Sequence, residues 1–390
     1  MTDLVDASWL QKAETQAIFS ALDSHLHRTR AVGGIVRDTI MGREHGGDID
    51  MATELLPGEV IARAKDANIA FYPTGIDHGT VTLKLGETLV EVTTLREDVE
   101  TDGRHAVVRF GTDWMEDARR RDFTLNALYV GADGTLFDPL GGVNDARSGR
   151  VRFIGDPDQR IAEDGLRVFR FFRLSASHSN GQLDQDGLFA CAAAAGRLDH
   201  LSRERVGGEM MRMLALPKVA KVMATMADVG LLPLPDKSKP ALAFYEEMGG
   251  QAATTRLALI SEGDLGFWQD RWRLSKDTTN GALAVWQAAI LLAEDRVAEA
   301  AYRHGEMAVE GLACVAALEQ WGRARLAETA RVLASLVVPP FPINGNDLAG
   351  LGMAPSPALG RALKQLEQAW IDSGFALSKA QLLGLVEFQP

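Results

Sequence analysis

The sequence predicts an α+β fold in which a mixed head is followed by an all-helical remainder. Four short runs have strand character, with a helix expected after Pro57 between them; the runs are residues 30–32, 48–52, 80–85 and 88–95. After Asp156 the apolar spacing becomes helical, with breaks near residues 180–181, 232–240 and 338–345. The chain shows no periodic repeat, so a mixed head followed by helices is the simplest organisation.

The head is expected to open with a helix that runs from Ser8 to Leu22. Ser8 and Gln11 have the spacing of a capping box at the start of this helix. Its buried stripe would consist of Trp9, Leu10, Ala13, Ala17 and Ile18.

Two later segments of the head are predicted as turns or loops. Residues 97–108 are polar and broken by a glycine, which indicates a mobile loop. Asp133 and Gly134 predict a tight hairpin between residues 128–130 and 136–138.

Length and composition favour a globular protein with more than one packed unit. The 390 residues exceed what one hydrophobic core usually organises, and a charged content of 24% is ordinary. No apolar run approaches the roughly 18 residues of a membrane span, and a signal-peptide pattern is missing at the N-terminus. Cys191 and Cys314 stand alone, which argues against a zinc site or a disulfide framework and favours a cytoplasmic location.

The acidic balance weighs against a nucleic-acid partner, but the charge is unevenly distributed. The formal net charge is −12, whereas phosphate binding usually requires clustered lysine and arginine. Between Thr101 and Ser175, however, 12 arginines balance 12 acidic residues, so the excess acid lies elsewhere. A local basic groove is therefore compatible with the sequence.

The segment from Ala31 to Asp50 joins a phosphate-type turn to a pair of carboxylates. Gly33 and Gly34 allow a sharp turn between a strand and a helix start, whose free N–H groups suit a triphosphate. Asp48 and Asp50 stand two residues apart in a strand, so both side chains emerge on one face and can hold Mg²⁺. Each motif alone is also compatible with a plain turn or with solvated carboxylates, but their order and spacing favour nucleotidyl transfer.

Other charged residues could complete such a site. Glu91 alternates with apolar residues along a strand, so it could add a third carboxylate; a lone glutamate there would simply be exposed. Residues 119–126 place three arginines beside Asp122 and Asn126, where they could bind phosphate oxygens or form a solvated helix end.

A third charged segment spans residues 163–170 and is expected to be one helix. Asp164 and Arg167 would then share a face and could read the edge of a nucleobase. They could equally form an ordinary intrahelical ion pair, which is the interpretation that spacing alone favours.

Taken together, these motifs resemble the class II tRNA nucleotidyltransferases and bacterial poly(A) polymerases, a family whose catalytic head is of the DNA polymerase β type. The resemblance runs in order from Ala31 to about Leu216, and a weaker one covers residues 341–352. It implies a nucleotidyltransferase head with a mixed sheet, then a helical neck that recognises the nucleobase, a helical body, and a helical tail that binds tRNA. The expected bounds of these four parts are 1–140, 141–216, 217–338 and 339–390.

The resemblance also implies roles for single residues. The catalytic and metal-binding carboxylates would be Asp48, Asp50 and Glu91. The triphosphate would be bound by Gly33, Gly34, Arg37, Arg120, Arg121 and Asn126. The nucleobase would be bound by Asp164 and Arg167, with support from Asp122, Glu163 and Arg170. Two further family motifs correspond to residues 138–142 with Asp145 and to residues 202–205 with Glu209.

The reaction implied is template-independent addition of CCA to tRNA 3′ ends from CTP and ATP, with release of pyrophosphate. Two Mg²⁺ ions held by the carboxylates would activate the tRNA 3′-hydroxyl and stabilise the leaving pyrophosphate. The expected partners are tRNA, CTP and ATP, without membrane association, and the sequence identifies no protein partner.

Several alternatives stay open. Within the family they are a poly(A) polymerase acting on RNA 3′ ends and an enzyme that adds only CC or only A. Poly(A) polymerases usually carry a basic run where this chain has residues 75–82, and CC-adding relatives tend to lack the loop at 97–108, so full CCA addition is favoured. Outside the family, three carboxylates disfavour a catalytically silent tRNA-binding protein. A metal phosphohydrolase is disfavoured because none of the eight histidines is followed by aspartate.

Two glycines depart from the family pattern. Gly165 stands where relatives often carry alanine, which would cost about 1 kcal/mol of helix propensity. Gly47 stands before the first aspartate, where a basic residue is common, so one contact to a phosphate or to the metal shell could be missing.

Overall fold

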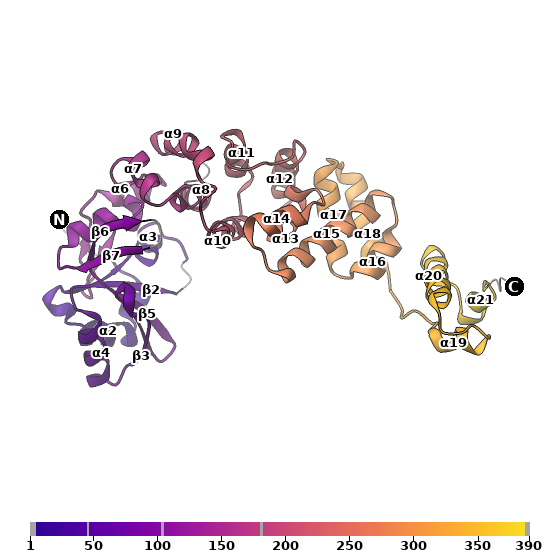
Figure 1. Ribbon diagram of the computed structural model, residues 1–390, viewed down its shortest axis with the longest axis horizontal. Coiled ribbons are helices and arrows are strands. Elements are labelled where there is room, and N and C mark those ends of the chain that lie inside the picture. The colour runs from indigo at the N-terminus through magenta and orange to yellow at the C-terminus, as the bar shows by residue number, and fades with distance from the viewer. Residues whose placement is uncertain (1–4, 45–46, 103–104, 180–181, 387–390) are drawn as a thin grey trace. The chain divides into compact units, whose positions relative to one another are not determined.

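The computed structural model describes residues 5–44, 47–102, 105–179 and 182–386. The chain divides into two compact units (Figure 1). Unit 1 comprises Met1–Glu209 with Thr225–Leu231, and unit 2 comprises Met210–Ala224 with Leu232–Pro390. The four-part division expected from the sequence is finer than these two units and stays a prediction. None of the helices in the described ranges has the length and apolar character needed to cross a membrane.

A seven-stranded mixed sheet forms the centre of the head. Its strands are β1 (Thr29–Val32), β2 (Ile49–Thr53), β3 (Ala70–Gly75), β4 (Thr80–Leu85), β5 (Thr88–Thr94), β8 (Tyr129–Val130) and β9 (Leu136–Phe137). Their order is β3-β4-β5-β2-β1-β8-β9, and only β2 and β5 pair in parallel. The four predicted strands are confirmed to within one residue at each end. The sequence analysis missed β3, an edge strand that contains Pro73 and is largely exposed.

The predicted helix at the N-terminus is broken into two pieces. Lys12, with φ −60° and ψ 136°, separates α1 (Ser8–Gln11) from α2 (Ala13–Ala21), and no side chain caps α1, so the capping box is wrong. Because a new helix begins at Ala13, the buried face differs from the predicted stripe, and Ala13 and Ala17 are exposed. The buried residues of the two helices are Trp9, Leu10, Thr15, Ile18 and Phe19.

The segment predicted as a mobile loop instead forms two paired strands. β6 (Arg96–Asp102) and β7 (His105–Phe110) are antiparallel partners in a separate two-stranded sheet. The loop prediction is therefore wrong for the described backbone, since a polar segment forms a ladder whenever its backbone groups find partners. The hairpin at Asp133 and Gly134 is confirmed, because β8 and β9 pair across it.

Helices make up most of the rest of unit 1. They are α3 (Gly34–Ile40), α4 (Pro57–Asp66), α5 (Trp114–Arg120), α6 (Gly142–Ser148), α7 (Pro157–Glu163), α8 (Leu166–His178), α9 (Gln185–Ala194) and α10 (Arg203–Leu214), which continues into unit 2. Short 3₁₀ turns are η1 (Ser24–Leu26), η2 (Ile76–His78), η3 (Thr124–Asn126) and η4 (Ala195–Arg197). Helix α4 confirms the prediction of a helix after Pro57. Phe123, Phe153 and Phe171 pack together with ring centroids 4.8–6.3 Å apart, which fixes α8 beside η3.

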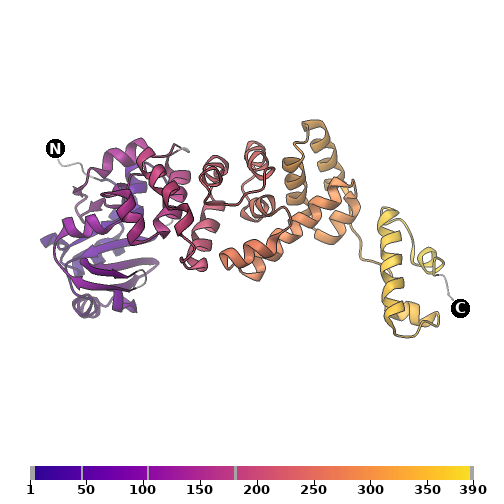
Figure 2. The ribbon, with the colours of Figure 1, turned by 45° about the horizontal axis from the view of Figure 1, so that its top comes forward.

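Every described element of unit 2 is a helix (Figure 2). The elements are α11 (Ala220–Asp228), which begins in unit 2 and ends in unit 1, α12 (Ser238–Glu247), α13 (Ala253–Ser261), α14 (Leu265–Trp272), α15 (Lys276–Ala293), α16 (Val297–His304), α17 (Met307–Leu318), α18 (Arg323–Ser335), α19 (Gly345–Gly350), α20 (Pro357–Asp372) and α21 (Lys379–Leu383). The helical prediction after Asp156 is confirmed, with breaks between α11 and α12 and between α18 and α19. The break predicted at residues 180–181 lies outside the described residues. The last three helices share an apolar cluster centred on Trp370.

Candidate active site

The glycine turn, Gly33 with Gly34, connects β1 to α3. Gly33 has φ +79° and ψ −129°, a conformation that residues with a Cβ atom rarely adopt. Its N–H donates to the carbonyl oxygen of Leu128 at 3.3 Å, which fixes the turn against the chain after η3. The sharp strand-to-helix turn expected from the sequence is confirmed.

Two of the three predicted carboxylates lie opposite each other on the parallel pair β2 and β5. Asp50 and Glu91 are register partners, and both are exposed while the residues before and after each of them are buried. Partners in register point to the same face of a sheet, so the two carboxylates are neighbours. Asp48 precedes β2 by one residue and is also exposed.

The electrostatics of this cluster show why it suits a cation. Surrounding protein atoms partly desolvate the Asp50 carboxylate and raise its pKa, and the negative charges of Glu91 and Asp48 raise it further against the opposing charge of Arg121. As the side chains stand, no three His, Cys, Asp or Glu residues in the described ranges are grouped closely enough to hold a metal ion. Carboxylates that share a surface repel one another, and a divalent cation between their hard oxygen atoms would relieve that repulsion.

The glycine turn lies beside this cluster. A Cβ atom at Gly33 would lie 4.0 Å from Asp50 Oδ2, from Arg121 Nη1 and from the Asn126 carbonyl oxygen. A carboxylate that could bind a cation and a guanidinium that could bind a phosphate therefore lie near the same glycine. Because glycine has no side chain, Gly33 itself does not obstruct a ligand there.

Arg120 and Arg121 are held in place by one buried carboxylate. Asp117 is completely buried; its Oδ1 accepts from Arg120 Nε at 2.8 Å, and its Oδ2 accepts from Arg121 Nε at 3.2 Å. Tyr129 donates its hydroxyl to Asp117 at 2.8 Å and accepts from Arg121 at 3.1 Å. Burial alone would raise the pKa of Asp117, but the charges of the two arginines overcome burial and lower it. The arginines are therefore fixed in orientation and not merely solvated, as a helix end would be.

Arg37 and Asn126 connect the glycine turn to α8. Arg37, only 8% exposed, donates Nη1–H to Asn126 Oδ1 at 2.6 Å. Asn126 donates to Asp122 Oδ1 at 3.0 Å, and Asp122 Oδ2 accepts from Arg170 Nε at 2.7 Å. Four predicted residues thus form one continuous chain of hydrogen bonds from α3 to α8.

The predicted helix through Asp164 and Arg167 is interrupted. Helix α7 ends at Glu163 and α8 begins at Leu166, so Asp164 lies in the junction with an extended backbone. Asp164 accepts from the N–H of Leu166 at 3.1 Å and from Arg205 at 3.0 Å.

Arg167 is paired elsewhere. It donates to Glu163 Oε2 at 2.8 Å and to the Arg160 carbonyl oxygen at 2.6 Å. The expected pair between Asp164 and Arg167 is therefore wrong, because the chain leaves the helix between them; the structure pairs each with a different residue.

The two glycines that depart from the family pattern have separate structural explanations. Gly165 lies in the junction before α8, where the expected propensity cost of a helix interior does not arise. A Cβ there would lie 2.8 Å from Leu198 Cδ2, so the site is closely packed. Gly47 has φ +85° with nothing within 4 Å of a Cβ, so backbone conformation and not space favours glycine.

The two further motifs organise segments around the site. Asp138 accepts from the N–H groups of Gly142 and Val143 at 2.8 and 3.0 Å, and Asp145 accepts from Thr124 at 2.6 Å. A Cβ at Gly142 would lie 2.1 Å from the Thr124 carbonyl oxygen, so α6 can approach η3 only through a glycine.

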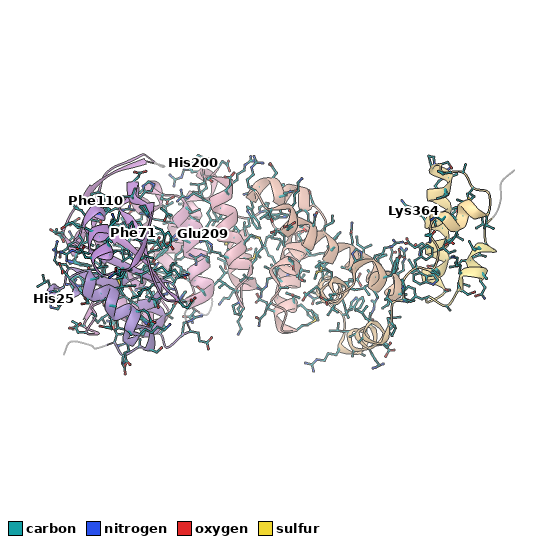
Figure 3. The ribbon with its side chains drawn as sticks, turned by 90° about the horizontal axis from the view of Figure 1, so that it is seen from below. His25, Phe71, Phe110, His200, Glu209 and Lys364 are labelled. Atoms are coloured by element: carbon teal, nitrogen blue, oxygen red, sulfur yellow. The ribbon has the colours of Figure 1, made fainter. Side chains whose placement is uncertain are left out.

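The motif at residues 202–205, with Glu209, contacts α8 and the junction before it. Arg205 supports Asp164, as described above. Glu209 (Figure 3) accepts from Arg173 of α8 at 2.5 Å, and Arg170 lies 3.9 Å from it. The motif therefore holds both the junction and α8.

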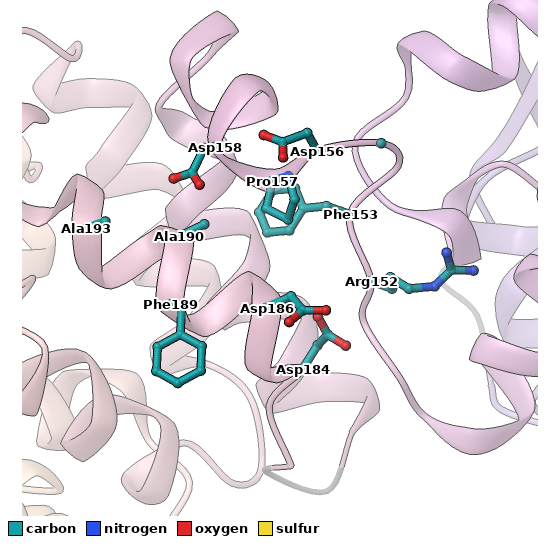
Figure 4. Close-up of a pocket in the computed structure, with 11 residues that line it drawn as sticks. Arg152, Phe153, Asp156, Pro157, Asp158, Asp184, Asp186, Phe189, Ala190 and Ala193 are labelled. Atoms are coloured by element: carbon teal, nitrogen blue, oxygen red, sulfur yellow. The ribbon is translucent and has the colours of Figure 1, made fainter.

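A separate cleft of about 680 Å³ contains none of the predicted site residues (Figure 4). Its lining includes the exposed ring of Phe189 and four aspartates, which are Asp156, Asp158, Asp184 and Asp186. Four carboxylates would repel a polyphosphate, so this cleft is not the nucleotide site.

Sequence reasoning missed two residues that organise the site. Asp117 stands three and four residues before the arginines it holds, and that helical spacing could have revealed it. His178 Nε2 lies 3.1 Å from Asp38 Oδ1, across 140 residues, and no local pattern could have predicted this contact.

Comparison with known proteins agrees with this geometry. The family described as Poly A polymerase head domain matches residues 29–152. A mitochondrial CCA tRNA nucleotidyltransferase 1 of Mus musculus is 32% identical over 97% of this chain and 92% of its own length. A CCA-adding enzyme of Geobacillus thermodenitrificans is 38% identical over 66% of this chain and 60% of its own length.

A solved structure shows the same fold over almost the whole chain. It is the Bacillus stearothermophilus CCA-adding enzyme in complex with CTP, which is 27% identical with a TM-score of 0.76. The alignment covers 96% of this chain and 98% of the Bacillus protein. With its polymerase β type of head and its helical remainder, the chain is a nucleotidyltransferase and belongs to the CCA tRNA nucleotidyltransferase family.

Proposed function

We propose that this protein adds CCA to the 3′ ends of tRNA, using CTP twice and ATP once and releasing one pyrophosphate at each step. The observation that carries the proposal is the register pairing of Asp50 with Glu91 beside Gly33 and Arg121. The names of the mouse and Geobacillus relatives, at 32% and 38% identity, support this choice of substrate and product.

Family membership implies that the enzyme uses a divalent metal ion, and we propose two Mg²⁺ ions. Asp48, Asp50 and Glu91 would hold them, and the bound ions would supply acidification of the 3′-hydroxyl and charge neutralisation at the phosphates. The raised pKa of Asp50 is consistent with this assignment, because desolvation and the negative charges of Glu91 and Asp48 together outweigh the opposing charge of Arg121.

The other site residues would orient the nucleotide. Gly33 and Gly34 would let the triphosphate approach the backbone closely, and Arg121, fixed by Asp117 and Tyr129, would contact a phosphate oxygen. A fixed guanidinium needs little reorganisation as negative charge develops, so it favours in-line attack on the α-phosphorus. Arg37, Arg120 and Asn126 would support this end of the nucleotide.

Asp164 and Arg167 would select the base at the start of α8. Arg205 and Glu163 hold these two side chains in fixed orientations, one at each side of the helix junction. A carboxylate and a guanidinium so placed offer an acceptor and donors to a nucleobase edge, which would replace a nucleic-acid template. The helical residues 217–390 would bind tRNA by shape.

Poly(A) addition is the second candidate, because the family model that matches residues 29–152 describes a poly(A) polymerase head. One assay separates the candidates: tRNA that lacks its last three nucleotides is incubated with CTP, ATP or both, and the product is sized. CCA addition predicts two added residues with CTP alone, three with both, and none with ATP alone. Long tails with ATP alone would establish poly(A) addition, and products that stop at CC with both nucleotides would establish CC addition.

We place the reaction in the cytoplasm. Both cysteines, Cys191 and Cys314, are free and buried, which suits a reducing compartment. The mouse relative is named as mitochondrial, so cell fractionation with antibody detection decides between the two compartments.

A further inference from the structure

Two series of side-chain contacts join α3 to α8, one through Asn126 of η3 and one through Asp38, and the α8 backbone between Arg170 and His178 closes them into a ring. We call it the α3–α8 ring, and its members are Arg37, Asp38, His178, Arg170, Asp122 and Asn126. The chain from Arg37 through Asn126 and Asp122 to Arg170 is described above. The return path runs through Asp38, which accepts from Arg37 at 2.9 and 3.1 Å and lies 3.1 Å from His178 Nε2.

His178 closes the ring from the last residue of α8. Its ring is only 8% exposed, and Ser177 Oγ lies 2.5 Å from its Nδ1. The Asp38 carboxylate can only accept, so its contact with His178 requires a proton on Nε2, while Nδ1 faces Ser177 Oγ and, at 3.2 Å, the Leu174 carbonyl oxygen. Asp38 therefore has two donors, one from its own helix and one from α8.

The ring controls the orientation of Arg37, whose Nη2 would lie 3.7 Å from a Cβ at Gly34. Asn126 and Asp38 fix its guanidinium from two directions. Without His178, Asp38 would keep only Arg37 as a side-chain partner at this point and could turn with it. A buried polar group that loses one partner is costly, so the arrangement depends on the whole ring.

We propose that His178 is a positioning residue for nucleotidyl transfer, acting through Asp38 to hold Arg37 against the glycine turn. Arg167, in the first turn of α8, lies 11 residues before His178, so a single helix would align the base end and the triphosphate end of the nucleotide. This inference rests on the proposed function, since it takes the glycine turn as the triphosphate site.

Two substitutions in the full chain test the proposal. His178→Leu fills the site with an apolar side chain and removes the Nε2–H donor to Asp38. His178→Gln keeps an N–H donor near the position of Nε2. His25→Leu is the matched control, because His25 is exposed in η1 (Figure 3). Steady-state incorporation of CMP into tRNA that lacks CCA gives kcat and the KM for CTP, and filter binding gives the Kd for tRNA.

We expect His178→Leu to lower kcat/KM for CTP about tenfold, because the hydrogen bond from His178 to the charged Asp38 carboxylate is lost. The Kd for tRNA should not change. His178→Gln should recover most of the loss, and His25→Leu should match the wild type. Equal losses in His178→Leu and His178→Gln, or a lower melting temperature in His178→Leu with unchanged kcat and KM, would overturn the proposal.

Hydrogen exchange separates the failure of this inference from failure of the proposed function. A wild-type protein that adds no nucleotide contradicts the proposed function only. The ring is then tested by amide exchange in α3, which His178→Leu must accelerate and His178→Gln must leave near the wild-type rate. Unchanged exchange in His178→Leu would show that His178 does not position this helix.

Discussion

Replacing Gly33 by alanine tests whether the glycine turn depends on its backbone conformation. A Cβ at Gly33 would meet no atom closer than 4.0 Å, so the substitution creates no clash. Its cost comes from φ +79° and ψ −129°, since a non-glycine residue held in such a region is destabilised by about 1–3 kcal/mol.

Gly34→Ala is the matched control one residue away. Its Cβ would lie 3.7 Å from Arg37 Nη2, an ordinary contact, and Gly34 is not among the glycines with positive φ. Alanine at a compatible helical position stabilises a protein by about 0.4–1 kcal/mol. The two substitutions therefore add the same methyl group to adjacent residues with opposite expected effects on stability.

Hydrogen exchange followed by mass spectrometry measures both variants locally. A loss of about 1–3 kcal/mol in the free energy of local opening makes the amides of β1 and α3 exchange roughly 5- to 150-fold faster in Gly33→Ala than in the wild type. Gly34→Ala should exchange no faster than the wild type. Equal exchange in the two variants, or faster exchange in Gly34→Ala, would refute the argument from backbone conformation.

Two further predictions concern buried charges. Arg256, completely buried in α13, donates to the carbonyl oxygens of Leu214 at the end of α10 and of Pro217 beyond it, and it pairs with Glu246 at 3.3 Å. Because Arg256→Met leaves the Glu246 carboxylate without this partner, it should lower the free energy of unfolding of unit 2 by about 3–5 kcal/mol. An unchanged melting midpoint by circular dichroism would contradict this. Burial lowers the pKa of His178 below its ordinary value of 6.5, so the fold favours the neutral ring and loses stability as the pH falls through the lowered value. Arg37, Arg43 and Asp38 face His178, and all three keep their charges between pH 7.5 and 5, because the pKa of Asp38 is lowered to about 2. Acidification from pH 7.5 to 5 should therefore destabilise the wild type relative to His178→Gln. A constant difference in urea midpoint between the two proteins would contradict this.

Local patterns in the sequence predicted most of the sheet, the glycine turn at Gly33 and the strand positions of Asp50 and Glu91. Strand alternation predicted that Glu91 points away from its apolar neighbours, and the family resemblance assigned it to the site; its register pairing with Asp50 came only from the structure. The edge strand β3 escaped because its exposed residues and Pro73 give no apolar alternation.

The geometry around α8 was predicted less well, since it depends on contacts between distant segments. A continuous helix through residues 163–170 was wrong because the backbone is extended at Asp164, whose carboxylate accepts from the N–H of Leu166, the first residue of α8. The contact between His178 and Asp38 joins residues 140 apart, and only the packing of α8 beside η3 determines it.

Removal of single carboxylates tests the central claim most directly, namely that Asp48, Asp50 and Glu91 together support metal-dependent transfer. Asp48→Ala, Asp50→Asn and Glu91→Gln should each reduce incorporation of labelled CTP and ATP by about a thousandfold or more, while the Kd for tRNA stays at the wild-type value. Glu87→Gln, an exposed carboxylate in the turn before β5, should incorporate both nucleotides at the wild-type rate. Incorporation by Asp50→Asn or Glu91→Gln at a rate close to that of Glu87→Gln would contradict the account.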